Sequence, residues 1–144
     1  MNDRFTFLRQ ALFADALVSS ACVAAMLVFA SPLAPLLELP AGLIFGAALS
    51  LVPFVALVTA VAWPAQPRAA GVWLVIALNL GWAVATAALA LSGRVTPNAF
   101  GWTFIAVQGL FVVAIAELEY FGLRRAQALG GNSRRSSASV GAPT

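Results

Sequence analysis

The feature that most constrains this chain is the segment Gly101–Arg125, which is apolar until it ends in two carboxylates and two arginines. No charged residue occurs in Val95–Ala116, and a helix of about 20 apolar residues crosses a hydrocarbon core of about 30 Å. Glu117 and Glu119 follow this uncharged run, in the last turns of the expected helix. The segment therefore predicts a transmembrane helix that leaves the membrane beside its two closing arginines.

Three more apolar segments of similar length precede this one, at residues 11–30, 40–62 and 70–91. With 62% hydrophobic residues, 9% charged residues and a mean hydropathy of +0.94, the chain is too apolar for a soluble fold of 144 residues. The sequence therefore predicts an all-α fold, a four-helix transmembrane bundle in the lipid bilayer. We expect residues 1–10 to form a cytoplasmic N-terminus, 11–125 the four-span domain, and 126–144 a disordered cytoplasmic tail.

Proline positions predict where these helices begin, end or bend. Pro32 and Pro35 are expected to end the first helix, since neither can continue its hydrogen-bond ladder. Pro53 lies in the middle of the second segment, where we expect it to kink the helix. Thr96 and Pro97 resemble an N-cap followed by proline at the first helical position, which predicts the start of the fourth helix.

The first apolar segment has a rival interpretation as a signal peptide, because basic residues precede it. Its length, the interruption by Asp15 and the lack of a clear small-residue cleavage site before Pro32 favour a retained helix. We therefore count it as the first of the four membrane spans.

Arginines are distributed unequally between the two ends of the predicted bundle, and the chain contains no lysine. In an antiparallel four-span arrangement, Arg94 stands alone at one end. The other end has both termini and the second connection, with Arg4, Arg9, Arg68, Arg124, Arg125, Arg134 and Arg135. Positively charged segments stay in the cytoplasm, so we expect both termini to be cytoplasmic.

Polar residues inside the spans are the candidate site residues, because each buried charge costs roughly 2.5–3.5 kcal/mol at mid-membrane on insertion scales. With a rise of about 1.5 Å per residue, Asp15, Asn79 and Glu117 lie at a similar depth. At about 3.6 residues per turn, Asp15 shares its face with Ser19, and Gln108 shares its face with Glu119. We expect these faces to meet in an intramembrane polar network of Asp15, Ser19, Asn79, Gln108 and Glu119.

A stripe of small residues in the second segment is a candidate contact surface. Gly42, Gly46 and Ser50 are spaced four residues apart, a pattern that lets another helix approach closely in lipid. We expect this stripe to face the bundle interior or to form an interface with a second chain. Glu117 projects almost opposite Gln108, so it is expected to reach headgroups, to pair with the closing arginines, or to join such an interface.

Several classes of chemistry are disfavoured by what the sequence lacks. There is no histidine, and Cys22 is the single cysteine, so neither an imidazole-based metal site nor a CxxC pair is expected. No phosphate-binding loop, hydrolase elbow or other catalytic motif occurs. The arginines mark span ends rather than a nucleic-acid stripe. We therefore expect no enzyme activity, no cofactor, no metal and no nucleic-acid partner.

The sequence resembles a widespread group of small bacterial four-helix membrane proteins that have no assigned activity. The similar stretches are FADALVS (13–19), ALNLGW (77–82), SGRVTPNAFG (92–101) and AELEYFGLRR (116–125). A weaker likeness is to small multidrug transporters, which are four-helix chains with one acidic residue in the first helix. This chain departs from them in having Asp15 in place of glutamate and in lacking their aromatic and glycine motifs.

Two functions remain open at this point. The first is an accessory or structural membrane protein that acts through helix–helix contacts, as a homodimer or in a larger membrane complex. The alternative is a small dimeric transporter, coupled to protons or other cations, that uses Asp15 together with Glu119. Against the alternative stands the simpler interpretation that both glutamates neutralise arginines at the membrane surface.

Overall fold

The computed structural model describes the backbone of residues 3–140 and the side chains of residues 4–131. A short 3-10 turn, Asp3–Phe5, leads into four α-helices within this range: α1 (Thr6–Leu37), α2 (Ala41–Ala62), α3 (Ala69–Leu91) and α4 (Ala99–Val140). Each of the four contains a stretch long and apolar enough to cross a membrane. This confirms the predicted all-helical bundle of four potential membrane spans.

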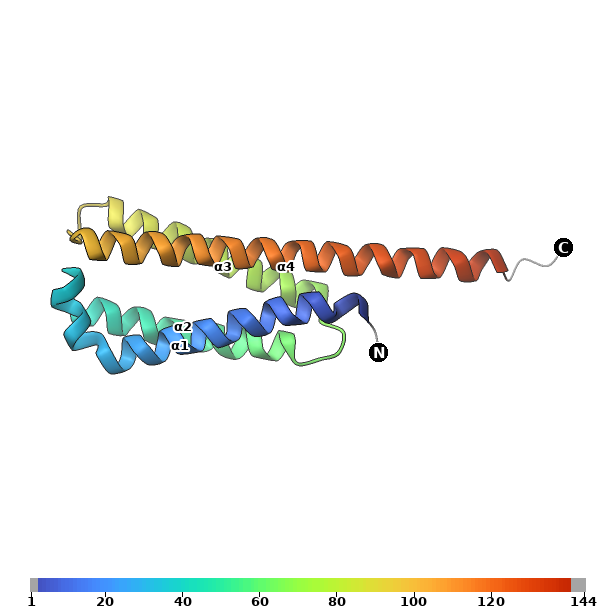
Figure 1. The fold of residues 1–144 in the computed structure, drawn as a ribbon, viewed down its shortest axis with the longest axis horizontal. Coiled ribbons are helices and arrows are strands. Elements are labelled where there is room, and N and C mark those ends of the chain that lie inside the picture. Colours follow the sequence, from blue (N-terminus) through green and yellow to red (C-terminus); the bar gives the residue numbers. More distant parts are fainter. Residues whose placement is uncertain (1–2, 141–144) are drawn as a thin grey trace.

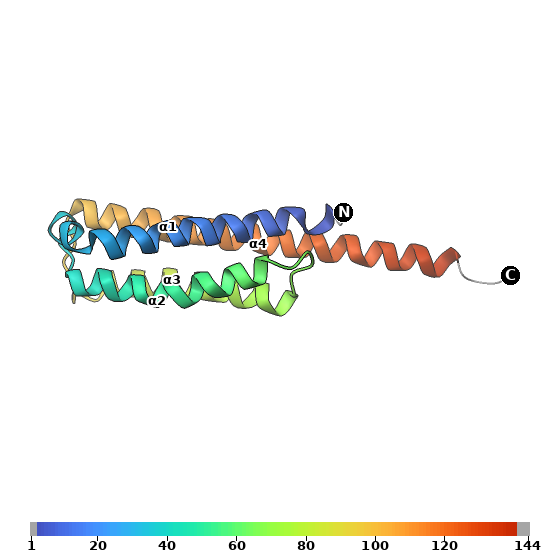
Figure 2. The same ribbon diagram turned by 90° about the horizontal axis from the view of Figure 1, so that it is seen from below.

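The helices run antiparallel, and each packs against its neighbours in the chain. α1 packs against α2 and α4, and α3 packs against α4 and, less extensively, against α2. α1 and α3 therefore occupy opposite corners of the bundle, with no backbone contact between them in the described residues. Both termini lie at the same end of the bundle, and α4 extends past the other three helices there (Figures 1 and 2).

The end of α1 differs from the prediction, because the helix continues through Pro32 and Pro35 to Leu37. Pro32 cannot donate to the carbonyl of residue 28, and the chain bends where this bond is missing. The bend is visible in the non-helical dihedral angles of Phe29 (φ −110°, ψ 16°). Proline thus bends α1 instead of ending it, while α2 remains helical through Pro53.

The start of α4 also differs from the prediction, since the capping residue is Asn98 rather than Thr96. The Asn98 side-chain oxygen accepts a hydrogen bond from the Gly101 backbone N–H at 3.0 Å. The Asn98 amide also donates to the Leu36 carbonyl at 3.0 Å, and a Cβ at Gly101 would collide with the Leu37 carbonyl. Asn98 therefore caps α4 and ties it to the end of α1.

Residues 126–140 were predicted to belong to a disordered tail. In the structure they are helical and continue α4. Ala126 is buried, and a Cβ at Gly130 would approach the Arg4 guanidinium. The first turns beyond Arg125 therefore pack on the N-terminal segment, which the sequence did not suggest. Residues 141–144 lie outside the described part of the chain.

The bundle has two halves that differ in packing. The terminal half, nearest the two termini, comprises residues 4–16, 56–79 and 113–131, and the distal half comprises residues 17–55 and 80–112. Side chains from all four helices form one core in the terminal half: Leu8, Leu12, Ala16, Val58, Ala62, Val72, Val75, Ile76, Ala116 and Leu123. In the distal half the buried cluster comes from α1, α2 and the turn between them: Met26, Ala30, Leu37, Leu39, Ile44 and Ala48.

Candidate functional site

Three buried polar side chains meet where the two halves join. Asp15 on α1, Asn79 on α3 and Glu119 on α4 are 2%, 3% and 0% exposed, and no other polar residue among the described side chains is buried to this degree. Their helices occupy three different corners of the bundle. We call these three residues the carboxyl cluster.

Asp15 is the hydrogen-bond acceptor at the centre of this cluster. The Asn79 side-chain amide donates to one carboxyl oxygen of Asp15 at 2.9 Å, and this bond joins the diagonally opposed helices α1 and α3. The Ser19 hydroxyl, one turn along α1, donates to the other carboxyl oxygen at 3.0 Å. Both oxygens of Asp15 therefore have a donor, which stabilises this carboxyl group in its ionised form.

Glu119 lies beside the same two partners, Asp15 and Asn79. Its carboxyl group interacts electrostatically with Asp15 and lies near the Asn79 amide. Neither carboxyl oxygen of Glu119 has a hydrogen-bond partner, although both are fully buried. Burying a polar group without such a partner costs about 1–3 kcal/mol, and more when the group is charged. The cluster therefore has hydrogen-bonding capacity that the bundle itself does not use.

A close helix contact explains why Glu119 points at Asp15. A Cβ at Gly122 would lie 3.0 Å from the Leu8 Cα, so α1 and α4 approach closely at this point. Leu8 and Asp15 are seven residues apart on α1, and Glu119 and Gly122 are three apart on α4, so each pair shares a face. The helix faces that touch at Gly122 therefore carry both carboxyl groups into the bundle.

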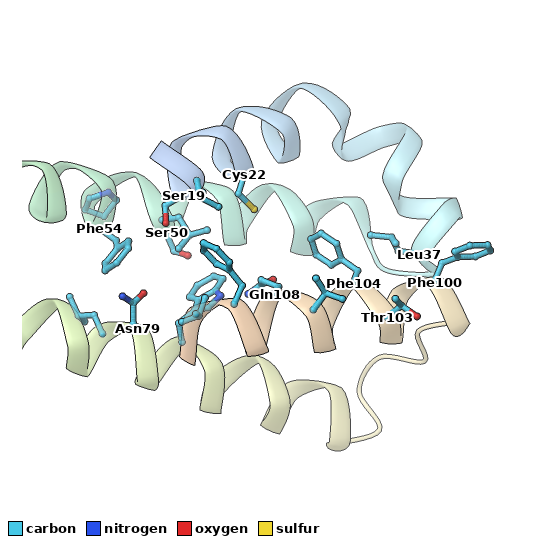
Figure 3. Close-up of a pocket in the computed structure, with 18 of the residues that line it drawn as sticks. Ser19, Cys22, Leu37, Ser50, Phe54, Asn79, Phe100, Thr103, Phe104 and Gln108 are labelled. Atoms are coloured by element: carbon cyan, nitrogen blue, oxygen red, sulfur yellow. The ribbon is translucent and has the colours of Figure 1, made fainter. Parts of the chain in front are cut away.

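A large cavity adjoins the cluster on its distal side. It has a volume of about 760 Å³, and side chains from all four helices line it. Ser19 and Asn79, the two donors to Asp15, are part of its wall and point into the space between the helix pairs (Figure 3). The remainder is largely apolar and aromatic, including Phe54, Trp82, Phe100, Phe104 and Phe111.

The other residues that the sequence singled out lie elsewhere. Gln108 is half-buried, lines this cavity and a second one of about 340 Å³, and makes no hydrogen bond among the described side chains. Gly42, Gly46 and Ser50 are exposed, and a Cβ at either glycine would meet nothing within 4 Å. Gly46 and Ser50 nevertheless line the second cavity, between α2 and the α3–α4 pair, so this part of the stripe faces interior space without packing closely on another helix.

The two glutamates of α4 have different surroundings. Glu117 is exposed on the outside of the bundle, whereas Glu119 is buried. Among side chains 4–131 neither forms an ion pair with an arginine, so surface neutralisation does not describe Glu119. The aromatic cavity wall was missed from the sequence, because aromatic residues in apolar spans more often pack in a core or face lipid.

The donor set of the cluster is two carboxyl groups, one amide and one hydroxyl. Such a set suits a proton or a cation that accepts oxygen ligands. No group of three or more histidine, cysteine, aspartate or glutamate side chains that could hold a metal ion occurs in the described residues. No protein-family model matches the chain, and neither a curated protein nor a solved structure shows significant similarity to it.

Proposed function

We propose that this chain is a small proton-coupled membrane transporter in which Asp15 and Glu119 together bind and release a proton. It is not an enzyme, it resides in a bacterial inner membrane with both termini in the cytoplasm, and it belongs to the group that its sequence resembles. The observation that carries this proposal is the Glu119 carboxyl group, fully buried beside Asp15 with both oxygens unpartnered.

The energetics of two adjacent carboxyl groups support a shared proton. Like charges this close in a dry interior cannot both be ionised without a large penalty. Because Asp15 accepts two hydrogen bonds and Glu119 accepts none, the shared proton is expected to favour Glu119 over Asp15. A purely structural role does not account for Glu119, because a leucine there would pack without the desolvation cost of a carboxyl group.

The structure around the carboxyl cluster offers a path for protons on the distal side only. From the distal half, the cavity reaches Ser19 and Asn79, which are bonded directly to Asp15. Toward the termini, the four-helix core closes the path. Transport therefore requires that the terminal core opens, and the α2–α3 boundary is the place to open it because these neighbours pack least extensively.

The test uses purified full-length protein in liposomes with an internal pH-sensitive dye and an imposed pH gradient. We expect Glu119→Gln and Asp15→Asn to abolish the protein-dependent proton flux. Glu117→Gln is the matched control, since Glu117 lies two residues away on the same helix but is exposed. Flux equal to wild type in Glu119→Gln would overturn the proposal.

A second candidate function, helix-mediated association with another chain, is supported by the small-residue stripe. A Cβ at Gly42 or Gly46 would meet nothing within 4 Å, so the helix of a second chain has room to approach α2 closely there. A homodimer that packs through this face is expected to dissociate when Gly46 is replaced by leucine. Molar mass measured by light scattering in detergent tests this, and an unchanged mass for a dimeric wild type would exclude the stripe as the interface.

A further inference from the structure

A further pocket lies at the end of the bundle that contains both termini, and we call it the terminal pocket. It has a volume of about 340 Å³ and is formed by the N-terminal turn, the α2–α3 connection and α4. We infer that this pocket binds the phosphate group of an anionic phospholipid, held by the guanidinium of Arg4. The site is separate from the carboxyl cluster, and its test does not depend on proton flux.

Arg4 brings to this pocket a cation whose position is fixed by its neighbours. The guanidinium carbon lies 4.8 Å from the centroid of the Phe5 ring, a distance at which the ring attracts the positive charge. A Cβ at Gly130 would lie 2.7 Å from Nη1 of Arg4, so the guanidinium also lies against α4. The N-terminal turn and α4 therefore hold the Arg4 side chain in the pocket wall.

The hydrogen-bond donors of Arg4 are not used within the bundle. Its Nε atom is fully buried and has no hydrogen-bond partner. Arg9 is different, because it donates to the backbone carbonyls of Ala62 and Trp63 at 3.2 and 3.5 Å. A buried donor without an acceptor is unfavourable, and more so in a charged group. An anion seated beside Arg4 would supply the missing acceptor.

The terminal pocket lies at the depth of lipid headgroups. Arg124 and Arg125 mark the end of the fourth span, and the part of the wall on α4 extends from Leu123 to Gly131. At about 1.5 Å per residue, this part of the wall is about 12 Å long. The headgroup layer is about 5–8 Å thick on each side of the hydrocarbon core. A phospholipid phosphate is therefore the anion that a membrane places beside this pocket.

The chemistry of the wall suits a phosphate group attached to a lipid. A guanidinium presents its N–H donors in a planar fork that matches phosphate oxygens. Ala69, the first residue of α3, also lines the pocket, and no side chain caps that helix. Its first backbone N–H groups, which have no partner within the helix, are additional donors for an anion. Phe5 and Leu123 provide apolar surface for the glycerol and the first acyl carbons.

The charges around the pocket favour an anionic lipid over a zwitterionic one. Arg68, Arg124 and Arg125 are exposed and adjoin wall residues in the sequence. No carboxyl group among the described side chains lines the pocket. The ammonium group of phosphatidylethanolamine would therefore meet arginines and no carboxylate. Phosphatidylglycerol carries an uncharged glycerol in the same place, so we expect it to bind more tightly.

The experiment is native mass spectrometry of the full-length, delipidated protein, which counts bound lipids and gives their dissociation constants. The probes are phosphatidylglycerol and phosphatidylethanolamine with identical acyl chains, with inorganic phosphate as a competitor. We expect one phosphatidylglycerol per chain to bind about fivefold more tightly than phosphatidylethanolamine, or better. Inorganic phosphate at the same concentration should not displace it. Equal affinity for the two lipids would overturn the inference, and displacement by inorganic phosphate would overturn the assignment to a lipid.

Two variants and a matched control test the named residues. Arg4→Gln should weaken phosphatidylglycerol binding by about tenfold or more, because it removes charge-assisted hydrogen bonds. Arg124→Gln loses the same charge at the same end of the bundle, but Arg124 is exposed and outside the wall. We expect its effect to be less than about threefold. Equal losses in these two variants, or wild-type binding in Arg4→Gln, would overturn the inference.

The second variant, Gly131→Leu, retains Arg4 and fills the pocket instead. A Cβ at Gly131 would meet nothing within 4 Å, so a leucine side chain has room there. Melting temperatures in lipid-free detergent establish that each variant is folded, and Gly131→Leu decides the matter if Arg4→Gln is not. We expect Gly131→Leu to weaken phosphatidylglycerol binding as well. Wild-type affinity in this variant would place the lipid outside the terminal pocket and would overturn the inference.

Discussion

The terminal and distal halves of the bundle are made from the same helices but are packed differently. In the terminal half, buried aliphatic side chains from all four helices form one continuous core. In the distal half, two cavities lie between the helices. The buried cluster there comes from the α1–α2 hairpin. The carboxyl cluster lies at the border between them, so the bundle places its charges where a closed core meets an open space.

Small residues and prolines explain much of this difference. A Cβ at Gly122 would meet Leu8 on α1, and one at Gly71 would lie 2.9 Å from the Val61 side chain on α2. These contacts bring neighbouring helices close together in the terminal half. In the distal half, α1 bends at Phe29 before Pro32, and large aromatic side chains line the cavity between the helices. We therefore expect the core of the terminal half to stabilise the fold. The cavities of the distal half leave room there for a small molecule or a lipid chain.

The largest expected effect comes from removing core volume in the terminal half. Leu12→Ala should lower the free energy of unfolding by about 2 kcal/mol or more, because Leu12 is fully buried and leaves a cavity. Leu51→Ala, which only enlarges the existing distal cavity, should cost less than about 1 kcal/mol. Reversible unfolding in mixed detergent measures both values, and equal losses would contradict the difference between the halves.

Glycine substitutions on one helix provide a second comparison. Gly122→Ala should destabilise the protein by about 1–3 kcal/mol, since the new Cβ would press on the Leu8 backbone. Gly109→Ala, in the distal half of the same helix, meets nothing within 4 Å and should be neutral or stabilising by up to about 1 kcal/mol. The melting temperatures of the two variants should therefore shift in different directions. A similar loss for both would mean that α4 packs as closely in the distal half.

Substitutions of Asp15 test the contact between α1 and α3 where the terminal and distal halves join. Asp15→Leu leaves the Asn79 amide without its acceptor and should cost about 1–2 kcal/mol, the strength of such bonds in model membrane peptides. Asp15→Asn retains a side-chain oxygen that can accept the bond and should melt within a few degrees of wild type. Wild-type stability in Asp15→Leu would show that the Asp15–Asn79 bond does not hold α1 to α3.

The smallest effect is expected from shortening α4. Ending the chain after Gly131 retains the contacts of Ala126 and Gly130 with the terminal half. We expect the free energy of unfolding to change by less than about 0.5 kcal/mol, as for most changes away from packed features. Ending the chain after Arg125 instead removes those contacts and should have the larger effect. The same melting assay compares the two, and the reverse order would refute the packing of this segment on the N-terminus.

The sequence was sufficient to predict the helices, because long apolar runs have one stable arrangement in lipid. It was less informative about their ends. Whether Pro32 bends or ends α1 depends on the tertiary contacts of Leu36 and Leu37 with the start of α4. Likewise, the continuation of α4 beyond Arg125 depends on packing against the N-terminal turn, a contact distant in the sequence.

For the site, helical periodicity was enough to direct Asp15, Ser19 and Asn79 toward one another, and the structure joins them by two hydrogen bonds. Periodicity alone did not separate Gln108 from Glu119, which share a face of α4 but lie in different halves. Nor did it indicate which face of α2 is buried, because glycines and aliphatic residues surround that helix on all sides. The cavity arises from four helices together, so no single segment predicts it.

The central claim is that the buried pair of Asp15 and Glu119 holds an exchangeable proton. Infrared difference spectra of the full-length protein in nanodiscs, recorded between acidic and alkaline pH, detect the C=O stretch of a protonated carboxyl group directly. The account predicts a band in wild type that persists in Glu117→Gln and disappears in Glu119→Gln. A band that is unchanged in Glu119→Gln but lost in Glu117→Gln would contradict it, because the exchangeable proton would then lie on the outer face of α4.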